Sequence, residues 1–430
     1  MRAVILSLIL VLAAGPIFCA EEIFLTVEEA VAIGLRDNRD VLLKSAEVKK
    51  AKFKINEAWS DVFPSLDFLG GWTDTKGLTR KDLALTTTQT TVKQTLFQGG
   101  KIINTIRYQG DKFEVEQRIL DRTNQELKAN VEKAFYTLLL AREYAQLNRN
   151  IVENTAAHLD FNRLRYKSGE VPESEILKVE ASLSNAEEAY KAALNQAESA
   201  QALLNNLLYL DKDVLVRPQG QFAYAEREVA FDQAFLLALK NRPEIRQYEA
   251  QERADKHSIE IAKAGGRPTI YASWEYFSRS SSGTIATAGT VTSSSGGAKH
   301  WNDYNTTGLT FSWPVFDGWE TKAKVEQAMV DLEQTRLLKE KKIKDIALEL
   351  KDAYLALKDG IAKIAAVESD LKFYIDNLSS AREQYRQGIV STLGLSDAGL
   401  KSGVAQFKKN EAVYDYLIAK SSFEKATGGS

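Results

Sequence analysis

The residues that most often carry out chemistry are few in this chain and far apart. There is one cysteine, Cys19, and there are three histidines, His158, His257 and His300. Zinc and iron sites draw on close clusters of these residue types, and no such cluster is present in the sequence. The pairs Gly99-Gly100 and Gly265-Gly266 do not form the GxGxxG fingerprint of a dinucleotide site. No nucleophile motif or phosphate loop is found. We therefore expect no catalytic residue, no metal and no cofactor.

Composition excludes two further classes of protein. Hydrophobic residues make up 44% of the 430 positions and charged residues 27%, which is typical of an ordered chain. The 56 Lys and Arg residues nearly balance 58 Asp and Glu residues, so the charge predicts no nucleic-acid partner. Seven prolines in the whole chain indicate long uninterrupted elements.

Residues 1–20 have the features of a secretory signal peptide. Arg2 precedes an apolar run over residues 4–14, and small residues follow at Cys19 and Ala20. Residues 16–18 are not those of a lipobox, so we expect cleavage near Cys19 or Ala20 rather than lipidation. A retained N-terminal anchor is the alternative. No later segment reaches the 18 or so apolar residues of a transmembrane helix, so a membrane-spanning form would have to use strands.

The rest of the chain is two copies of one unit. Ala30 aligns with Ala234 at an offset of 204 residues, and Tyr166 aligns with Tyr385 at an offset of 219. The 15 additional residues of the second copy fall between about 278 and 308, in a stretch rich in Ser, Thr and Gly that we predict to be a long polar loop. We place the two structural repeats at 21–220 and 221–430.

Each copy predicts two helices, two strands and two long helices. The first pair of helices is expected over 27–37 and 40–61, and over 231–241 and 244–264 in the second copy. Alternation of apolar and polar residues predicts strands over 65–73, 86–97, 270–276 and 309–315. Strands of about ten residues with flanking aromatic residues favour a membrane β-barrel. A small soluble sheet fits the strand signals equally well.

The long helices carry apolar residues seven positions apart. One series in the first copy is Val131, Leu138, Ala145, Val152, Leu159 and Tyr166, and a second is Ile106, Phe113, Leu120, Leu127, Ala134 and Ala141. The matching series in the second copy is Ile343, Leu350, Leu357, Ile364, Leu371, Leu378 and Tyr385. Two series offset by three or four positions form the seam of a left-handed coiled coil.

Helix lengths predict how these elements are arranged. The uninterrupted helix over 100–166 should be roughly 100 Å long. The return helix, over 173–210, is too short to pair with all of it, so we expect the 40–61 helix to complete the pairing end to end. The strands then lie at one end, and the turns at Gly169 and Gly388 at the other. Four strands cannot close a barrel alone, so other copies of the chain must contribute.

The chain resembles the TolC family of outer-membrane efflux proteins over almost its whole length. The resemblance rests on the tandem duplication and on several short motifs together. They are Thr95-Leu96-Phe97-Gln98-Gly99-Gly100, Trp313-Pro314-Val315-Phe316-Asp317-Gly318, Asn241-Arg242-Pro243-Glu244-Ile245, Arg165-Tyr166-Lys167-Ser168-Gly169 and Gln384-Tyr385-Arg386-Gln387-Gly388.

This resemblance implies a mainly α protein with membrane β-structure. Each chain would be one continuous channel protomer of a homotrimer, with a long coiled-coil α-barrel across the periplasm. Its four strands would contribute to a trimeric 12-stranded β-barrel in outer-membrane lipid. The family conducts substrates outward from an inner-membrane transporter, to which it is joined by a periplasmic adaptor (membrane fusion protein).

The resemblance also suggests where function lies. The adaptor-docking candidates at the helix tips are Gly169, Glu170, Val171, Gly388, Ile389 and Val390. The alternative is that the glycines only make the turns. Gate residues at the periplasmic constriction match Ser174, Glu175, Tyr385 and Asp397. The chain departs from the family at Val390, where a basic residue can occur, and at Gly394, where an acidic one can occur. Glu175 and Asp397 also fit a simpler role as solvated acids near helix N-termini.

Two other classes compete with this interpretation. An exported periplasmic coiled-coil adaptor or scaffold would also be helical, but it would have one helical hairpin and no duplicated strand pair. A closed porin would lack helices of 67 residues.

Overall fold

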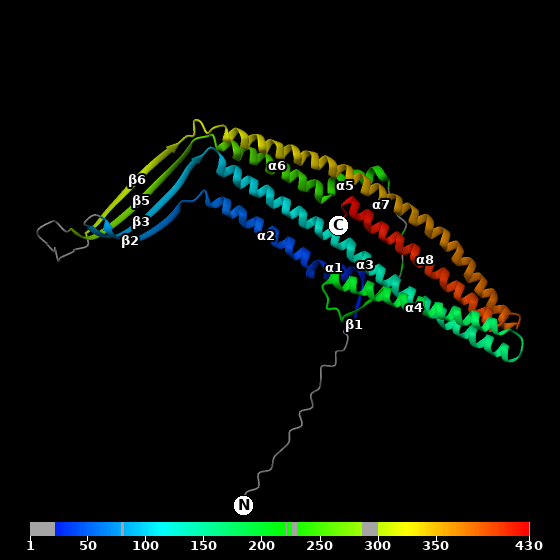
Figure 1. Ribbon diagram of the computed structural model, residues 1–430. Coiled ribbons are helices and arrows are strands. Elements are labelled where there is room, and N and C mark those ends of the chain that lie inside the picture. Colours follow the sequence, from blue (N-terminus) through cyan, green and yellow to red (C-terminus); the bar gives the residue numbers. More distant parts are fainter. Residues whose placement is uncertain are drawn as a thin grey trace, which may run out of the picture. The chain divides into compact units, whose positions relative to one another are not determined.

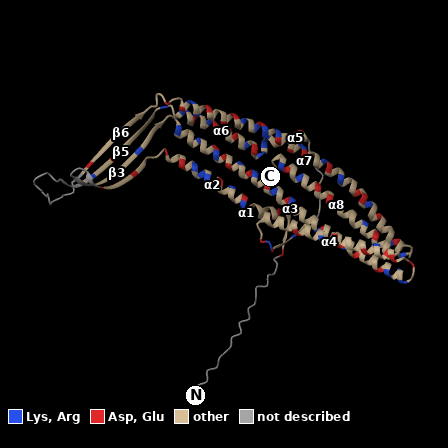
Figure 2. Cartoon of the chain, in the orientation of Figure 1, with Lys and Arg blue, Asp and Glu red and all other residues tan. Residues whose placement is uncertain are grey.

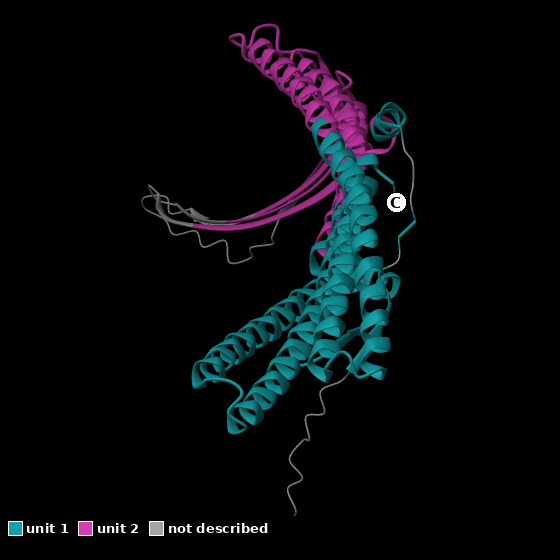
Figure 3. Cartoon of the chain, turned by 90° about the vertical axis from the view of Figure 1, so that its right-hand side faces the viewer, with its two compact units in different colours: residues 1–42, 123–238, 348–430 teal, residues 43–122, 239–347 magenta. Residues whose placement is uncertain are grey.

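The computed structural model describes residues 22–78, 81–220, 222, 224–225, 230–285 and 300–429, so the predicted signal peptide lies outside the described residues. The chain divides into two compact units (Figure 3). Unit 1 comprises residues 1–42, 123–238 and 348–430, and unit 2 comprises residues 43–122 and 239–347. Both units take segments from both halves of the sequence. The repeat boundaries at 21–220 and 221–430 stay a prediction.

The same order of elements occurs twice along the chain (Figure 1). The first half contains α1 (Val27–Asp37), α2 (Arg39–Ser60), β2 (Ser65–Leu78), β3 (Lys81–Gln98), α3 (Lys101–Lys167) and α4 (Glu173–Leu208). The second contains α5 (Phe231–Asn241), α6 (Pro243–Ala264), β5 (Thr269–Ile285), β6 (His300–Ser312), α7 (Glu320–Arg386) and α8 (Thr392–Thr427). The predicted mainly α class with duplicated elements is confirmed, and α3 and α7 each have 67 residues.

The strands are longer than predicted. β5 and β6 extend into the segment 278–308 that we expected to be a loop, and of that segment residues 286–299 lie outside the described part of the chain. Paired strands supply ladder hydrogen bonds to Ser- and Thr-rich sequence, and this pairing is invisible to a local apolar pattern. β6 ends at Ser312 rather than at 315, because Pro314 has no N–H to donate to a ladder.

The long strands form one antiparallel sheet in the order β2-β3-β5-β6. β2 and β6 are therefore the two edge strands, and they run in opposite directions. Cross-strand neighbours share a face of the sheet, as with Leu66 opposite Val92 and Val92 opposite Trp274. The sheet belongs to unit 2.

A second, smaller sheet was missed. β1 (Glu22–Leu25) pairs in parallel with β4 (Leu215–Pro218), and Arg217 forms an ion pair with Glu22 at 2.7 Å. Val216 is fully buried. Four-residue strands carry too few alternations to be recognised, and the pairing joins segments about 190 residues apart in sequence.

The predicted heptad stripes form the core of unit 1 in the middle of the long helices. Val131, Leu138, Leu350 and Ile364 are fully buried. The last members of the series, Tyr166 and Tyr385, are 45% and 43% exposed, so the stripe does not continue to the helix ends. α8 faces this core with alanines seven residues apart, all buried: Ala398, Ala405, Ala412, Ala419 and Ala426.

Among the described residues, none of the helices combines the length and apolar character needed to cross a membrane. The same residues contain no group of three or more His, Cys, Asp and Glu side chains arranged to hold a metal ion.

Candidate functional site

The two helix-tip turns of unit 1 share one backbone design. Gly169 has φ +73° and donates its N–H to Tyr166 O, while Glu170 donates to Arg165 O. Gly388 has φ +74°, and the same two bonds run from Gly388 and Ile389 to Tyr385 and Gln384. These paired bonds define a Schellman motif, in which the left-handed residue is normally glycine. Nothing lies within 4 Å of a Cβ built at either glycine. Glycine is therefore required at these positions by the positive φ angle and not by lack of space.

The docking candidates differ in what they contact. Ile389 is 70% exposed, whereas Val171 and Val390 are half-buried. Glu170 accepts a hydrogen bond from Arg165 Nε at 3.1 Å, which closes the first turn. The second turn therefore presents an apolar side chain to solvent where the first presents an ion pair.

The two departures from the family pattern are coupled in space. A Cβ added at Gly394 would lie 2.7 Å from Val390 Cγ1, which is closer than atoms approach. Gly394 also donates its backbone N–H to the Oγ of Ser391, which caps the N-terminus of α8. With valine at 390, an acidic side chain cannot be placed at 394 without displacing the valine.

The structure does not bring the four gate candidates together in one contact network. Ser174 is exposed, and Glu175 pairs with Lys178 on the same helix at 2.7 Å. Tyr385 Oη accepts a long hydrogen bond, 3.4 Å, from Thr392 across the turn. Asp397 on α8 reaches α3, where its Oδ1 lies 3.0 Å from His158 Nε2.

The contact between Asp397 and His158 is the last rung of a polar ladder between α3 and α8. From Glu132–Ser421 to Asn154–Ser396 the residue numbers rise along α3 and fall along α8, so the two helices are antiparallel. The remaining rungs are Glu132–Ser421 at 2.5 Å, Thr137–Tyr414 at 3.0 Å, Glu143–Asn410 at 2.7 Å and Asn154–Ser396 at 2.5 Å. This ladder could not be predicted from the sequence, because each partner lies more than 200 residues away and no local pattern marks it.

The α7–α8 contact in the same unit combines close packing with ion pairs. The ion pairs are Lys363–Asp415 at 2.5 Å, Glu368–Lys409 at 3.0 Å and Glu349–Lys425 at 3.9 Å. Tyr416 is fully buried, and a Cβ at Gly360 on α7 would lie 3.2 Å from its Cα. The Tyr416 hydroxyl donates to the backbone carbonyl of Ala225 at 2.7 Å. α8 thus contacts α7 through close packing and ion pairs, and α3 through a row of hydrogen bonds.

Burial perturbs one carboxyl group in the ladder. Glu143 is half-buried, and desolvation raises its pKa above the ordinary value, while the hydrogen bond from Asn410 acts in the opposite direction. Ionised Glu143 is therefore less stable in the folded protein than in the unfolded chain.

The sequence is similar to those of known outer membrane proteins. The outer membrane efflux protein family matches residues 34–208 and 236–429. The alkaline protease secretion protein AprF of Pseudomonas aeruginosa is 25% identical over 312 residues, which are 69% of this chain and 60% of that protein. The chain thus spans less than two thirds of this relative's length.

Solved channel structures share the fold. The CmeC outer membrane channel of Campylobacter jejuni superposes with a TM-score of 0.74 at 18% identity, over 94% of this chain and 85% of that one. The outer membrane protein VceC of Vibrio cholerae gives 0.72 at 13% identity, over 94% and 96%. Together with the family match over both halves, this similarity establishes that the chain belongs to the outer membrane efflux protein family and has a TolC-like fold.

The tip turn at Gly388 predicts a contrast between two glycines. Gly388→Ala should reduce the free energy of unfolding by about 1–2 kcal/mol, because alanine disfavours a positive φ. Gly399→Ala, inside α8 and equally free of neighbours, should raise it by about 0.5–1 kcal/mol. Thermal unfolding followed by circular dichroism measures both. If both substitutions changed the free energy of unfolding equally, the positive φ of Gly388 would not be the reason for glycine at this turn.

The raised pKa of Glu143 predicts that its replacement by glutamine stabilises the protein in a pH-dependent way. The folded state holds the Glu143 proton more tightly, so the free energy of unfolding falls as pH rises from the unfolded-state to the folded-state pKa. Glu143→Gln should therefore be more stable than the wild type at pH 7, and the difference should shrink on acidification through that interval. The control Glu187→Gln, on the exposed side of α4, should have the same free energy of unfolding as the wild type at pH 7 and at acidic pH. A Glu143→Gln variant less stable at pH 7 would contradict the sign.

Proposed function

We propose that this chain is the outer-membrane exit duct of a tripartite efflux or type I secretion system. It would passively conduct substrates handed over by a periplasmic adaptor and an inner-membrane transporter. Two relatives support the proposal, since AprF is a secretion protein and CmeC is an outer membrane channel. An exported coiled-coil scaffold fits less well, because it has no use for a duplicated pair of long strands.

The observation that carries the proposal is the four-stranded sheet with an apolar face. Near the helices, one face presents large apolar side chains that are 62–72% exposed: Leu66, Phe68, Trp72, Leu309 and Phe311. The opposite face carries Asp67, Lys93 and Glu275. Contact with lipid accounts for so large an exposed apolar surface, and an aqueous lumen accounts for the charged face.

The free edges of this sheet support assembly from several copies. β2 and β6 run in opposite directions, so β2 of one copy can extend the ladder of β6 of the next in the antiparallel sense. Unpaired strand edges are not tolerated in lipid, so the ring must close. Three copies would give the 12-stranded barrel and homotrimer that the family resemblance implies.

We place adaptor docking at the two tip turns and the gate at the same end. The exposed side chain of Ile389 supports the docking role, and the polar ladder ending at His158–Asp397 supports a gate. A hydrogen-bonded contact can exchange with water at a small net cost, whereas separating α7 from α8 would also expose the fully buried Tyr416, which packs closely on Gly360. Opening would therefore separate α8 from α3 and keep α7 and α8 together.

Planar-bilayer conductance of the purified protein tests the duct. We expect a small, mostly closed, cation-preferring conductance that rises severalfold in Asp397→Asn, because the contact with His158 is weakened. Changes at Glu175 or Tyr385 should act in the same direction. The matched control is Asp415→Asn, which removes the Lys363 pair at 2.5 Å farther from the tip and should leave conductance unchanged. Failure of the protein to insert into any bilayer would rule out the duct.

Export by living cells tests the docking surface. Ile389→Asp should abolish export while leaving assembled oligomers intact, because it introduces a charge into the exposed apolar side chain of the turn. Gly388→Pro should do the same by disrupting the turn. Ile375→Asp, also exposed on α7 but four turns from the tip, is the control and should export normally. Normal export by Ile389→Asp would show that docking lies elsewhere.

A further inference from the structure

The last rung of the α3–α8 ladder contains a group that changes charge near neutral pH. His158 Nε2 on α3 lies 3.0 Å from Asp397 Oδ1 on α8. Imidazole is the side-chain group that most often gains or loses a proton between about pH 5 and pH 8. With a neutral imidazole this rung is a hydrogen bond to a carboxylate, and with a protonated imidazole it is an ion pair. The strength of the rung therefore depends on pH.

The position of this rung gives it influence over the ends of both helices. His158 lies nine residues before the end of α3 at Lys167, and Asp397 lies five residues after the start of α8 at Thr392. The rung is thus about 8–14 Å from the helix ends. Helices open locally from the ends where contacts are fewest, so a weaker terminal rung lets the tips separate while the inner rungs remain.

The His158–Asp397 pair is partly shielded from water, unlike the other charges at its level. The two side chains are 24% and 47% exposed. The pairs Arg163–Glu180 and Lys363–Asp415 fix the level on α4 and α7. The other charged groups there are exposed: Glu153 and Asp160 on α3, Glu187 and Glu188 on α4, Asp376, Arg382 and Glu383 on α7, and Lys401 on α8. Water and salt screen exposed charges, so the shielded pair dominates the local response to pH.

A second rung responds to protons with the same sign. Burial raises the pKa of Glu143, which accepts a hydrogen bond from Asn410 across the α3–α8 contact. Separating the helices would return this carboxyl group to water and bring its pKa back toward the ordinary value. The closed contact therefore binds the Glu143 proton more tightly than the separated one, and acidification favours closure at this rung as well.

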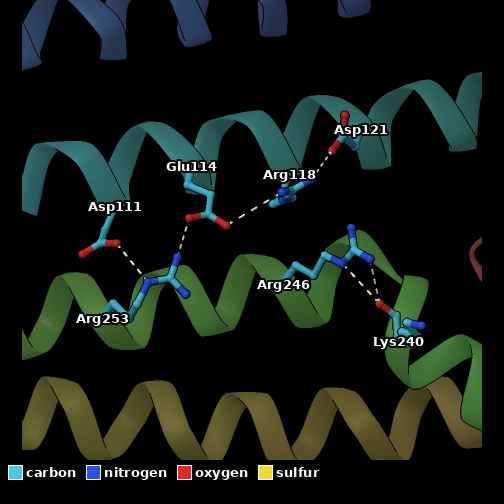
Figure 4. Close-up of polar contacts among 7 residues, drawn as sticks. All are labelled: Asp111, Glu114, Arg118, Asp121, Lys240, Arg246 and Arg253. Atoms are coloured by element: carbon cyan, nitrogen blue, oxygen red, sulfur yellow. Dashed lines mark hydrogen bonds and ion pairs between the residues drawn. The ribbon is translucent and has the colours of Figure 1, made fainter.

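The corresponding histidine of unit 2 has a competing cation. His257 Nε2 lies 3.6 Å from Asp111 Oδ2, but Arg253 already donates to the same carboxylate at 3.0 Å and also to Glu114 (Figure 4). Lys and Arg occur with Asp and Glu along the helices (Figure 2), and Arg keeps its charge at every physiological pH. Protonation of His257 therefore adds little. At Asp397, His158 is the one ion-pair partner among the described residues.

We infer that His158 and Asp397 form a proton-sensitive latch that holds α3 and α8 together under acidic conditions and releases them as the pH rises. Protonated His158 makes a charge-assisted hydrogen bond to Asp397, and loss of the proton leaves a weaker bond that water can replace. The duct would then close in acid and open more often near pH 8. This role rests on the proposed function, since it names the regulation of the gate.

Conductance in planar bilayers at about pH 5.5 and about pH 8 tests the latch. Wild-type conductance should be severalfold higher at the higher pH. His158→Gln keeps a hydrogen-bond donor but cannot become charged, so its conductance should be high at both pH values and lose most of the response. The matched control His257→Gln, beside Asp111 in unit 2, should respond as the wild type does. A wild-type response in His158→Gln, or a wild-type conductance that falls as pH rises, would overturn the latch.

Exchange of the two side chains separates the latch from a folding defect. His158→Asp alone places two carboxyl groups together and should leave conductance high at both pH values. His158→Asp/Asp397→His restores one imidazole and one carboxylate, so the pH response should return. Circular dichroism checks that each variant keeps its helices. An exchanged variant that is helical and conducts without a pH response would contradict the latch.

Spin labels follow the α3–α8 contact without relying on conduction. In a Cys19→Ser background, Ala157→Cys on α3 and Lys408→Cys on α8 place labels at two exposed positions. An excess of unlabelled protein makes distances within one copy dominate. The label-to-label distance should lengthen as pH rises, and in His158→Gln it should be long throughout. If the protein conducts but neither conductance nor distance responds to pH, the latch is wrong and the duct stands. If it never conducts, the proposed function fails, and the distance alone decides whether the latch exists.

Discussion

The burial of a narrow apolar stripe, repeated every seven residues, is the constraint on which the helical part of this protein depends. A helix of 67 residues can bury only one such stripe against its partner, so most of its surface remains polar or exposed. In unit 1 the stripe of α7 meets alanines of α8, whose small side chains allow close approach. Outside this stripe, the faces of a helix differ in their hydrogen-bonding groups and charges.

The difference between the local apolar stripe and the long-range polar contacts explains what could be predicted from the sequence. Helix periods and ends were predicted within a few residues, because Pro64, Pro268, Gly169 and Gly388 act locally. The full lengths of β5 and β6 could not be predicted, since Ser- and Thr-rich strands are stabilised by their neighbours. The β1–β4 sheet and the α3–α8 ladder were missed for the same reason. At the candidate site, the two glycine turns were predictable, but the partner of Asp397 lies 239 residues away.

The polar contacts also differ in what they can do. In unit 2, Arg and Lys side chains pair with carboxylates between α3, α6 and α7, and these pairs set which helix faces which. In unit 1, the α3–α8 rungs are side-chain hydrogen bonds. Thr137–Tyr414 and Asn154–Ser396 join neutral groups, and the other three rungs each include a carboxyl group. Hydrogen bonds to water can replace such rungs at a small net cost in free energy, which suits this contact to reversible separation.

The packing of Val390 on Gly394 has a consequence for how the sequence can change over time. Any side chain at 394 first meets the valine methyl group, so a mutation there is tolerated only in a background where 390 has already become smaller or has turned away. Mutations at 390 meet no such barrier from 394. The two positions are therefore epistatic in one direction: an acidic residue at 394 requires that the valine at 390 be replaced by a smaller residue or rotate away.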